Sequence, residues 1–388
     1  MKRYEKYKPS GVEWIGEVPE GWEIIPFKHC ADINNGADYK DVETDDENAY
    51  PVIGSGGVFA YATKYMYDGE VIFLGRKGTV DKPLYFNGKF WAIDTMFYAI
   101  PKNKNYGKFL YYQSLTFPFD YYLTNTARPS MTQTDLGDNK ICLPPLPEQT
   151  AIAAYLDAKC AKIDNVVAVQ QKRIELLKEL KQSIITHAVT KGLDKTAKMK
   201  PSGVEWIGEV PEGWEVIPFK HCATINNGID YKDVETDDEN AYPVIGSGGA
   251  FAFATKYMYD GEVIFLGRKG TVDKPLYFNG KFWVIDTMFY AVPQKNSNGK
   301  YLYYQALTFP FDYYLTNTAR PSMTQTDLGD NRIVLPPLPE QTAISNYLDK
   351  KCATIDRQIQ KVEKQIELLK EYKQSVITEC VTGKRKVC

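Results

Sequence analysis

Two long stretches decide the fold: LPPLPEQTAIAAYLDAKCAKIDNVVAVQQKRIELLKELKQSIITHAVT at residues 143–190 and LPPLPEQTAISNYLDKKCATIDRQIQKVEKQIELLKEYKQSVITECVT at residues 335–382. The proline cluster that opens the first stretch ends a strand, because proline donates no backbone hydrogen bond. From about Glu148 neither proline nor glycine occurs until Gly192. The pattern predicts helices of roughly 40 residues, each about 60 Å long at 1.5 Å per residue.

Apolar residues recur in both stretches at alternating spacings of four and three, which is typical of a coiled-coil seam. The first seam comprises Ile163, Val167, Ile174, Leu177 and Ile184, and the second comprises Ile355, Ile359, Val362, Ile366, Leu369 and Val376. Gln170 replaces Val362 in the first frame, and Lys181 and Lys373 interrupt the two seams. A helix this long cannot bury its stripe against one small domain, so we expect it to pack against its own repeat. The alternative is two unrelated surface helices.

The helices belong to a tandem repeat that spans most of the chain. Residues 8–190 align with residues 200–382 at a constant offset of 192 without a gap, and 151 of the 183 aligned residues are identical. A period this long indicates two copies of one module rather than a solenoid. The expected organisation is two globular domains at 1–146 and 200–338, two long helices at 147–190 and 339–382, a linker at 191–199 and a tail at 383–388.

Each globular domain combines strand-like runs with one short helix. The runs EVIFLG (70–75), KPLYF (82–86) and KFWAIDTMFYAI (89–100) are rich in β-branched and aromatic residues, and Gly and Asn-Gly separate them. GKFLYYQSLTF (107–117) is predicted to be helical. The fold class is therefore α+β, repeated twice.

Composition sets limits on the function. The chain has 388 residues, of which 44% are hydrophobic and 25% charged, and these values are typical of a globular protein. No apolar run reaches the roughly 18 residues that a membrane helix requires, and no apolar run follows the basic N-terminus as in a secretory signal. Seven cysteines without a CxxC pair indicate reduced thiols and a cytoplasmic protein. The net charge of −2 requires a nucleic-acid binder to gather its basic residues on one face or to rely on a partner.

The motifs of the common enzyme classes are missing from the sequence. Neither the phosphate-binding GxxxxGK[ST] nor the dinucleotide-binding GxGxxG occurs, and the Pro-Pro pairs lie in LPPLP rather than in the Asp/Asn-Pro-Pro-aromatic motif of an amino-methyltransferase. The pairs His29-Cys30 and His221-Cys222 lack further ligands at metal spacing. We therefore expect a protein that is not an enzyme and binds neither a metal nor a cofactor.

Two loops in each repeat carry residues suited to DNA. GRKGT (75–79) places basic side chains on a turn flanked by glycines, and TARPSMTQTDLGD (126–138) adds Arg, Ser, Thr and Gln on a loop shaped by proline. Arginine pairs with guanine edges, glutamine pairs with adenine, and both types also reach phosphates. The candidate DNA-binding residues are Arg76, Lys77, Thr79, Arg128, Ser130, Thr132, Gln133, Arg268, Lys269, Thr271, Arg320, Ser322, Thr324 and Gln325. The alternative for each loop is an ordinary solvated turn.

Two motifs together point to a known family. SGVEWIGEVPEGWE (10–23 and 202–215) is followed about 120 residues later by LPPLPEQTAI (143–152 and 335–344) and a long helix. This pairing, present in both copies and spanning essentially the whole chain, resembles the DNA-specificity subunit of type I restriction-modification systems.

The resemblance implies two target-recognition domains separated by antiparallel coiled-coil helices, with an approximate two-fold axis. It also implies a non-catalytic chain that binds double-stranded DNA, two methyltransferase subunits and restriction/translocase subunits. S-adenosylmethionine, ATP and Mg are then expected on those partners, and LPPLPEQ with the following helix at the partner interface. Members usually carry two dissimilar recognition domains, whereas these two are nearly the same. The expected target is therefore an interrupted palindrome.

Two other functions are consistent with parts of the sequence. One is a self-contained nuclease-methyltransferase fragment with unrecognised catalytic motifs, which would act on DNA without partners. The other is a protein scaffold whose globular domains bind proteins, which would not direct methylation. Assays of the chain alone and with a methyltransferase separate these functions from DNA specificity.

Overall fold

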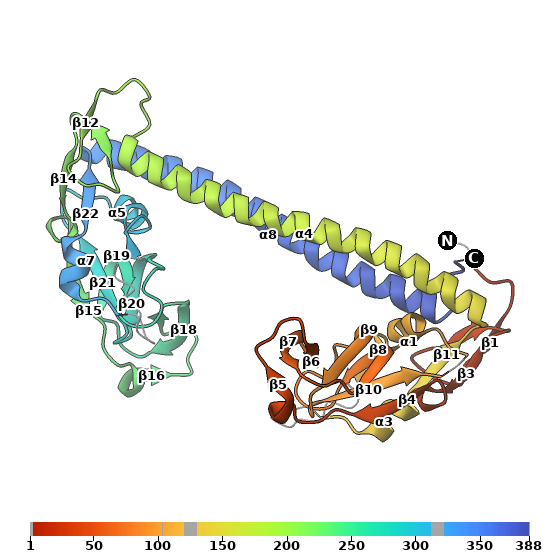
Figure 1. Ribbon diagram of the computed structural model, residues 1–388. Coiled ribbons are helices and arrows are strands. Elements are labelled where there is room, and N and C mark those ends of the chain that lie inside the picture. The colour runs from red at the N-terminus through yellow and green to blue at the C-terminus, as the bar shows by residue number, and fades with distance from the viewer. Residues whose placement is uncertain (1–2, 103, 120–129, 312–321, 388) are drawn as a thin grey trace. The chain divides into compact units, whose positions relative to one another are not determined.

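The computed structural model describes residues 3–102, 104–119, 130–311 and 322–387. The chain forms two compact units, one made of residues 1–170 and 364–388 and the other of residues 171–363. Each unit therefore contains one globular domain, the first half of the long helix that follows it, and the second half of the other repeat's long helix. The structure confirms the predicted α+β class with two repeated domains and two long helices (Figure 1).

The globular domain of unit 1 is built around a seven-stranded sheet. Its described elements are β1 (Tyr7–Pro9), β2 (Glu17–Pro19), β3 (Glu23–Pro26), η1 (Phe27–His29), β4 (Ala31–Asn35), η2 (Lys40–Val42), β5 (Glu43–Thr44), β6 (Tyr50–Gly54), β7 (Gly57–Ala62), β8 (Tyr67–Gly75), β9 (Leu84–Ala92), β10 (Met96–Pro101), α1 (Gly107–Ser114), α3 (Gln133–Asp138) and β11 (Lys140–Leu143). The sheet order is β4-β10-β8-β9-β6-β7-β5, and β1-β2 and β11-β3 form two small sheets. Neighbouring strands pair antiparallel except β6 and β9.

Unit 2 repeats this architecture. Its described elements are β12 (Met199–Pro201), β13 (Glu209–Pro211), β14 (Glu215–Pro218), η3 (Phe219–His221), β15 (Ala223–Asn227), η4 (Lys232–Val234), β16 (Glu235–Thr236), β17 (Tyr242–Gly246), β18 (Gly249–Ala254), β19 (Tyr259–Gly267), β20 (Leu276–Val284), β21 (Met288–Pro293), α5 (Gly299–Ala306), α7 (Gln325–Asp330) and β22 (Arg332–Leu335). The sheet order is β15-β21-β19-β20-β17-β18-β16, which is the same as in unit 1.

The interior strand β8 is covered on both faces, which explains its continuous apolar run. Ile72 and Leu74 belong to the main core with α1 and the long helices, whereas Val71 and Phe73 pack on the opposite face with Phe90. All of Val71 to Gly75 is buried. Because successive side chains of a strand point to opposite faces, a run that is apolar at every position fits a strand buried on both sides.

Two strand boundaries differ from the predicted ones. The run 89–100 is split by a turn at 93–95, so that β9 and β10 are separate strands. The Asn87-Gly88 pair makes no turn, and β9 continues through it. Gly88 lies opposite Gly69 of β8, with φ values of +134° and +145°. Glycine adopts such backbone angles readily because it has no Cβ, so here the residue permits an irregular extended strand rather than a hairpin.

The long helices are α4 (Leu146–Lys191) and α8 (Leu338–Val381), which begin at the proline clusters. In each unit the two helices run in opposite directions, because residues of the first half of one helix contact residues of the second half of the other. Lys373 pairs with Asp164 at 2.7 Å in unit 1, and Lys181 pairs with Asp356 at 2.7 Å in unit 2. The two ion pairs are equivalent: at the offset of 192, Lys373 corresponds to Lys181 and Asp356 to Asp164, so each repeat supplies the lysine once and the aspartate once. The lysines that interrupt the seams in the sequence therefore bind aspartates of the opposite helix.

The seam residues of the two helices are all buried or half-buried. Ile163, Ile355, Ile359, Val362, Ile366 and Val376 are buried. Val167, Ile174, Leu177, Ile184 and Leu369 are half-buried. Towards the domains the buried stripe continues beyond the predicted seam, through Ile152 and Leu156 at the start of α4. Each helix therefore joins the core of a globular domain as well as the other helix.

Each domain also holds the end of the other repeat's helix. In unit 1 the core includes Val376, Ile377 and Val381 of α8, and Gln113 of α1 donates a hydrogen bond from Nε2 to the Val381 carbonyl at 2.7 Å. In unit 2 the equivalent Gln305 of α5 donates to the Val189 carbonyl of α4 at 3.0 Å. The last carbonyls of a helix have no partner within the helix, so these buried amides satisfy them.

Candidate nucleic-acid interface

The first predicted loop lies where β8 ends and is fixed by the turn before β10. The backbone N–H groups of Arg76 and Lys77 both donate to the Thr95 carbonyl, at 2.9 and 3.3 Å. The Arg76 guanidinium donates to the Asp94 carbonyl at 3.2 Å and lies 5.8 Å from the centre of the Phe97 ring. A cation–π contact with the ring and one hydrogen bond restrain the guanidinium.

Glycine at position 75 lets this loop close tightly. A Cβ there would come within 2.2 Å of the Thr79 carbonyl and 2.6 Å of the Val80 Cα, so no larger residue fits without moving the backbone. Gly78 has a φ of +82°, which suits glycine at a turn. Lys77 is exposed at the tip of the loop, and Thr79 is half-buried beneath it.

The second predicted loop lies against the first. Ser130 forms an isolated antiparallel bridge with Lys77, and the Met131 N–H donates to the Arg76 carbonyl at 3.0 Å. Met131 is buried below, whereas Ser130 is exposed beside Lys77. The structure thus brings together two loops that lie about 50 residues apart in the sequence. Arg128, and Arg320 in the second repeat, lie outside the described residues.

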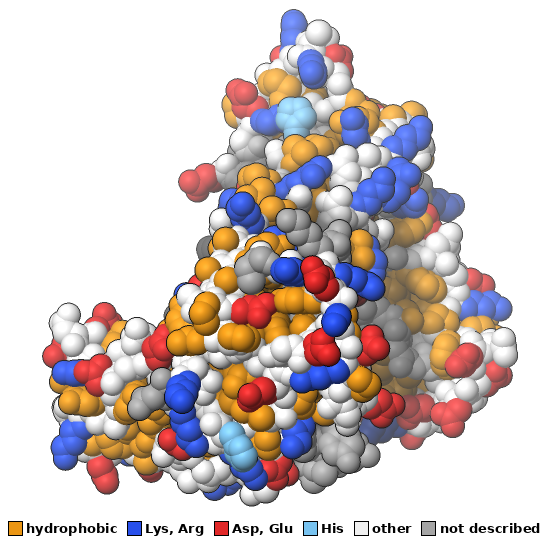
Figure 2. All heavy atoms as spheres, turned by 90° about the vertical axis from the view of Figure 1, so that its right-hand side faces the viewer, with side chains coloured by type: hydrophobic (Ala, Val, Ile, Leu, Met, Phe, Trp, Pro, Cys, Tyr) orange, Lys and Arg blue, Asp and Glu red, His pale blue; other side chains and the backbone are white. Residues whose placement is uncertain are grey.

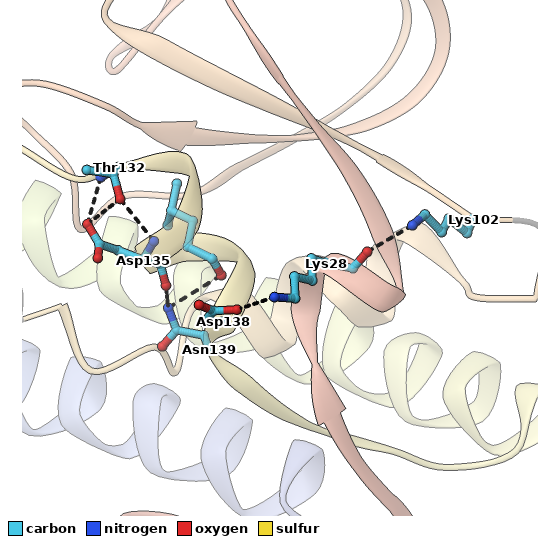
Figure 3. Close-up of polar contacts among 7 residues, drawn as sticks. Lys28, Lys102, Thr132, Asp135, Asp138 and Asn139 are labelled. Carbon is cyan, nitrogen blue, oxygen red and sulfur yellow. Dashed lines mark hydrogen bonds and ion pairs between the residues drawn. The ribbon is translucent and has the colours of Figure 1, made fainter.

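Two of the predicted contact residues have structural roles. Thr132 caps α3: its hydroxyl accepts from the Asp135 N–H at 3.1 Å, while the Asp135 carboxylate accepts from the Thr132 N–H at 2.9 Å (Figure 3). The Gln133 side-chain amide donates to the Ile33 carbonyl of the edge strand β4. Such a reciprocal cap stabilises a helix start. Thr324 and Gln325 make the same contacts in unit 2.

A further ion pair anchors α3 at this edge of the sheet. Lys28 of η1 binds Asp138 at 2.6 Å, and the Lys28 carbonyl accepts from Lys102 at 2.9 Å (Figure 3). The helix is therefore attached at both ends, which holds the loop before it in place.

A third loop, after β4, reaches the same turn from the other side. The Gly36 N–H donates to the Met96 carbonyl at 3.0 Å and the Ala37 N–H to the Ala92 carbonyl at 2.9 Å, while Trp91 Nε1 donates to the Ala37 carbonyl at 3.1 Å. A Cβ on Gly36 would lie 1.9 Å from the Ile93 carbonyl, so glycine is required at this close approach. The apex of this loop carries no basic residue, so the charge pattern of the sequence does not point to it.

These three loops and the turn at 92–96 define what we call the recognition face of unit 1. The face of unit 2 has the same hydrogen bonds. Arg268 and Lys269 donate to the Thr287 carbonyl at 2.9 and 3.2 Å, the Met323 N–H donates to Arg268, and Ser322 bridges Lys269. Thr271 corresponds to Thr79 and is also half-buried. Each unit therefore presents one equivalent face.

Charge is mixed on the one face of the molecule that Figure 2 draws. On the face drawn in Figure 2, basic and acidic side chains are interspersed with apolar ones. The acidic run at 41–47 is mostly exposed, and it surrounds β5 at the far edge of the sheet.

The LPPLPEQ motif divides into an internal part and an exposed part. Glu148 accepts hydrogen bonds from Tyr4 and from Trp22 Nε1, and Gln149 accepts from the Tyr106 N–H at 2.9 Å. These contacts seat α4 on its domain. The residues just before them, 145–147, are exposed, and Leu146 has 47% of its surface accessible. Leu338 is exposed in the same way in unit 2.

No helix in the part of the chain that the structure describes has the length and apolar character needed to cross a membrane.

Comparison with known proteins gives consistent matches over most of the chain. Residues 19–179 and 211–368 match the family described as the type I restriction modification DNA specificity domain. The chain is 26% identical to the putative MjaX specificity subunit of a type I restriction enzyme from Methanocaldococcus jannaschii, covering 96% of both chains. It is 22% identical to the EcoDI specificity subunit from Escherichia coli, covering 95% of this chain and 89% of that one.

The fold matches a solved structure as well. A chain from a structure that describes complex assembly and conformational transition of the type I R-M system superimposes with a TM-score of 0.71 at 18% identity, covering 94% of this chain and 98% of the other.

Proposed function

The chain belongs to the type I restriction-modification DNA-specificity family, with a non-catalytic role in reading DNA sequence, and we propose that it directs a partner adenine methyltransferase and a restriction/translocase subunit to a bipartite, interrupted palindrome. One observation carries this proposal: each unit has the same recognition face. Three residues of the unit 1 face have identical counterparts in unit 2, held by the same backbone hydrogen bonds: Arg76 corresponds to Arg268, Lys77 to Lys269 and Ser130 to Ser322.

The contacts between the repeats support inverted half-sites. Two kinds of contact between the repeats recur with the repeats exchanged: the ion pair Lys373–Asp164 recurs as Lys181–Asp356, and the hydrogen bond Gln113–Val381 recurs as Gln305–Val189. Such reciprocity is the property of an isologous, two-fold interface. Readers related by a two-fold axis bind inverted half-sites, as dimeric repressors do. We therefore propose two similar half-sites separated by unread bases.

Arg76 and Lys77, with Arg268 and Lys269, are the base or phosphate contacts that we favour. They are the basic groups on the described recognition faces, and Ser130 and Ser322 lie exposed beside them. Thr132, Gln133, Thr324 and Gln325 act by holding the loops, because their side chains already bind the protein.

The partner subunits are proposed to dock on the outside of the helices. The exposed 145–147 and 337–339 segments lie at the starts of α4 and α8, and α4 continues with exposed apolar side chains on its outer side, namely Val166, Val169, Leu176 and Leu180. Two equivalent segments fit two copies of a methyltransferase subunit. The chemistry, with S-adenosylmethionine, ATP and Mg, then belongs to the partners.

The proposal is tested by purifying the chain alone and together with its methyltransferase. We expect the chain alone neither to cleave nor to methylate DNA, and the complex to methylate adenine at one interrupted motif. Cleavage or methylation by the chain alone would instead support a self-contained enzyme. An unchanged methylation pattern with and without the chain would support a protein scaffold.

A further inference from the structure

The two recognition faces differ in an exposed side chain at one loop position, because their other difference, Ala92 against Val284 in the turn, is buried. The third loop ends with Ala37 in unit 1 and Ile229 in unit 2, whereas the first two loops are identical in the described residues. The Ile229 side chain is 55% exposed. A difference at this position therefore changes the shape of the face without changing its basic groups.

Both backbone groups of this residue are fixed, in the same way in each unit. The Ile229 N–H donates to the Val284 carbonyl at 2.9 Å, and its carbonyl accepts from Trp283 Nε1 at 3.0 Å. Ala37 makes the equivalent bonds with Ala92 and Trp91. The fold of the loop therefore needs only a small side chain, and the additional carbons of isoleucine extend into solvent.

The position lies on the same turn that holds the basic loop. Residues 284–287 bind Ile229 through the Val284 carbonyl and bind Arg268 through the Asp286 and Thr287 carbonyls. Asp230 follows Ile229, and its carboxylate accepts from the Lys232 N–H, as Asp38 does from Lys40. This acid is the same in both units and cannot distinguish them.

We propose that Ile229 contacts a thymine C5-methyl group, so that unit 2 reads one base pair that unit 1, with Ala37, does not read. An exposed aliphatic group on the turn that also holds Arg268 matches the one apolar feature of the major groove, which is this methyl group. Burial of one methyl or methylene group is worth about 0.8 kcal/mol, or about fourfold in binding. The target is then a near-palindrome with one position of unequal stringency. The inference rests on the proposed function.

Deoxyuridine, which lacks the C5-methyl group, is the probe. The full chain in complex with its methyltransferase is bound to duplexes that carry the mapped motif, with thymines replaced one at a time. For the natural chain we expect one thymine, in one half-site, whose replacement weakens binding about fourfold, with no such effect at the matching position of the other half-site. Ile229→Ala should abolish this sensitivity, and Ala37→Ile should create it in the opposite half-site.

Leu193→Ala serves as the control, because it removes an exposed apolar side chain from the linker rather than from a recognition face; it should leave deoxyuridine sensitivity unchanged. If the natural complex reads a motif but responds equally to deoxyuridine before and after both substitutions, the inference is wrong and the proposed function stands. If the natural complex reads no motif, the proposed function itself fails.

Discussion

At the residue scale, one buried amide in each unit links the two repeats. Gln113 is fully buried and donates to the Cys142 carbonyl at 2.6 Å as well as to the Val381 carbonyl. Gln113→Ala leaves two buried carbonyls without this donor, which should lower the free energy of unfolding by about 1–3 kcal/mol. Urea unfolding of the full chain measures the change.

The control for this substitution is a surface amide at the same joint. Gln374 of α8 donates to the Leu115 carbonyl at 2.9 Å but is exposed, so water replaces the bond when it is lost. Gln374→Ala should change stability by no more than about 0.5 kcal/mol. Equal losses for the two variants would show that the buried contact has no special role.

The cysteines give a second prediction at this scale. Burial raises the pKa of Cys30 to about 11 and the pKa of Cys142 and Cys380 to about 12. Because the thiolate is the reactive form, these thiols should resist a thiol reagent at pH 8 until the chain unfolds. In the unfolded chain the thiol pKa is near 9. Below that pH the protonated thiol contributes fully to the stability of the folded state, and this stability is lost as the pH rises towards 11 and above. Rapid labelling of these cysteines in the native chain would contradict the buried core.

Sequence reasoning at the residue scale found the basic loops but not the residues that hold them. Arg76 and Lys77 were selected by their charge, and charge is visible in a sequence. The residue type of Gln133 predicts a base contact, and the structure adds a hydrogen bond from its amide to the Ile33 carbonyl, 100 positions away. Which partner an amide side chain takes depends on a tertiary contact, and local sequence does not contain that information.

At the element scale, periodicity predicted the long helices because it depends only on sequence. The proline clusters that mark the starts of α4 and α8 and the 4-3 spacing are local signals. The sequence predicts one strand over 89–100, because the residues on both sides of the turn at 93–95 are apolar and buried and read as one continuous run. Asn-Gly is typical of a hairpin turn, so the sequence predicts a turn at Asn87-Gly88. The structure instead uses Gly88 inside β9, opposite Gly69 of β8, and the sequence cannot distinguish the two uses.

The same elements predict an unequal effect of two kinds of substitution. Val376 of α8 is buried in the core of unit 1, so Val376→Ala should cost about 1–3 kcal/mol in unfolding free energy. Asp356→Ala removes the partly exposed pair with Lys181, and surface pairs contribute only about 0–1 kcal/mol. Urea unfolding of both variants compares them. A larger loss for Asp356→Ala would mean that ion pairs rather than apolar packing hold the helices.

At the scale of the whole molecule, the exchange of helix ends predicts that one repeat can pair with itself. A fragment of residues 1–190 lacks α8, but a second copy supplies Val189 where the full chain supplies Val381. Its weak point is Gln170, which replaces Val362 and whose Oε1 is buried without a partner among the described residues. We expect a dimer that dissociates on dilution, and tighter association for Gln170→Val, since an unpaired buried polar group costs about 1–3 kcal/mol.

Sedimentation of the fragment over a range of concentrations measures this association. A fragment that stays monomeric at high micromolar concentration, with and without Gln170→Val, would contradict the expectation that one repeat pairs with itself.

The central claim is that two equivalent readers recognise one interrupted palindrome. The most direct test is to map the methylated adenines in DNA from cells that express this chain with its methyltransferase, using modification-sensitive sequencing. We predict two half-sites that are inverted complements, apart from at most one position of unequal stringency, separated by a gap of fixed length. Two half-sites of unrelated sequence, or a continuous site without a gap, would contradict the account.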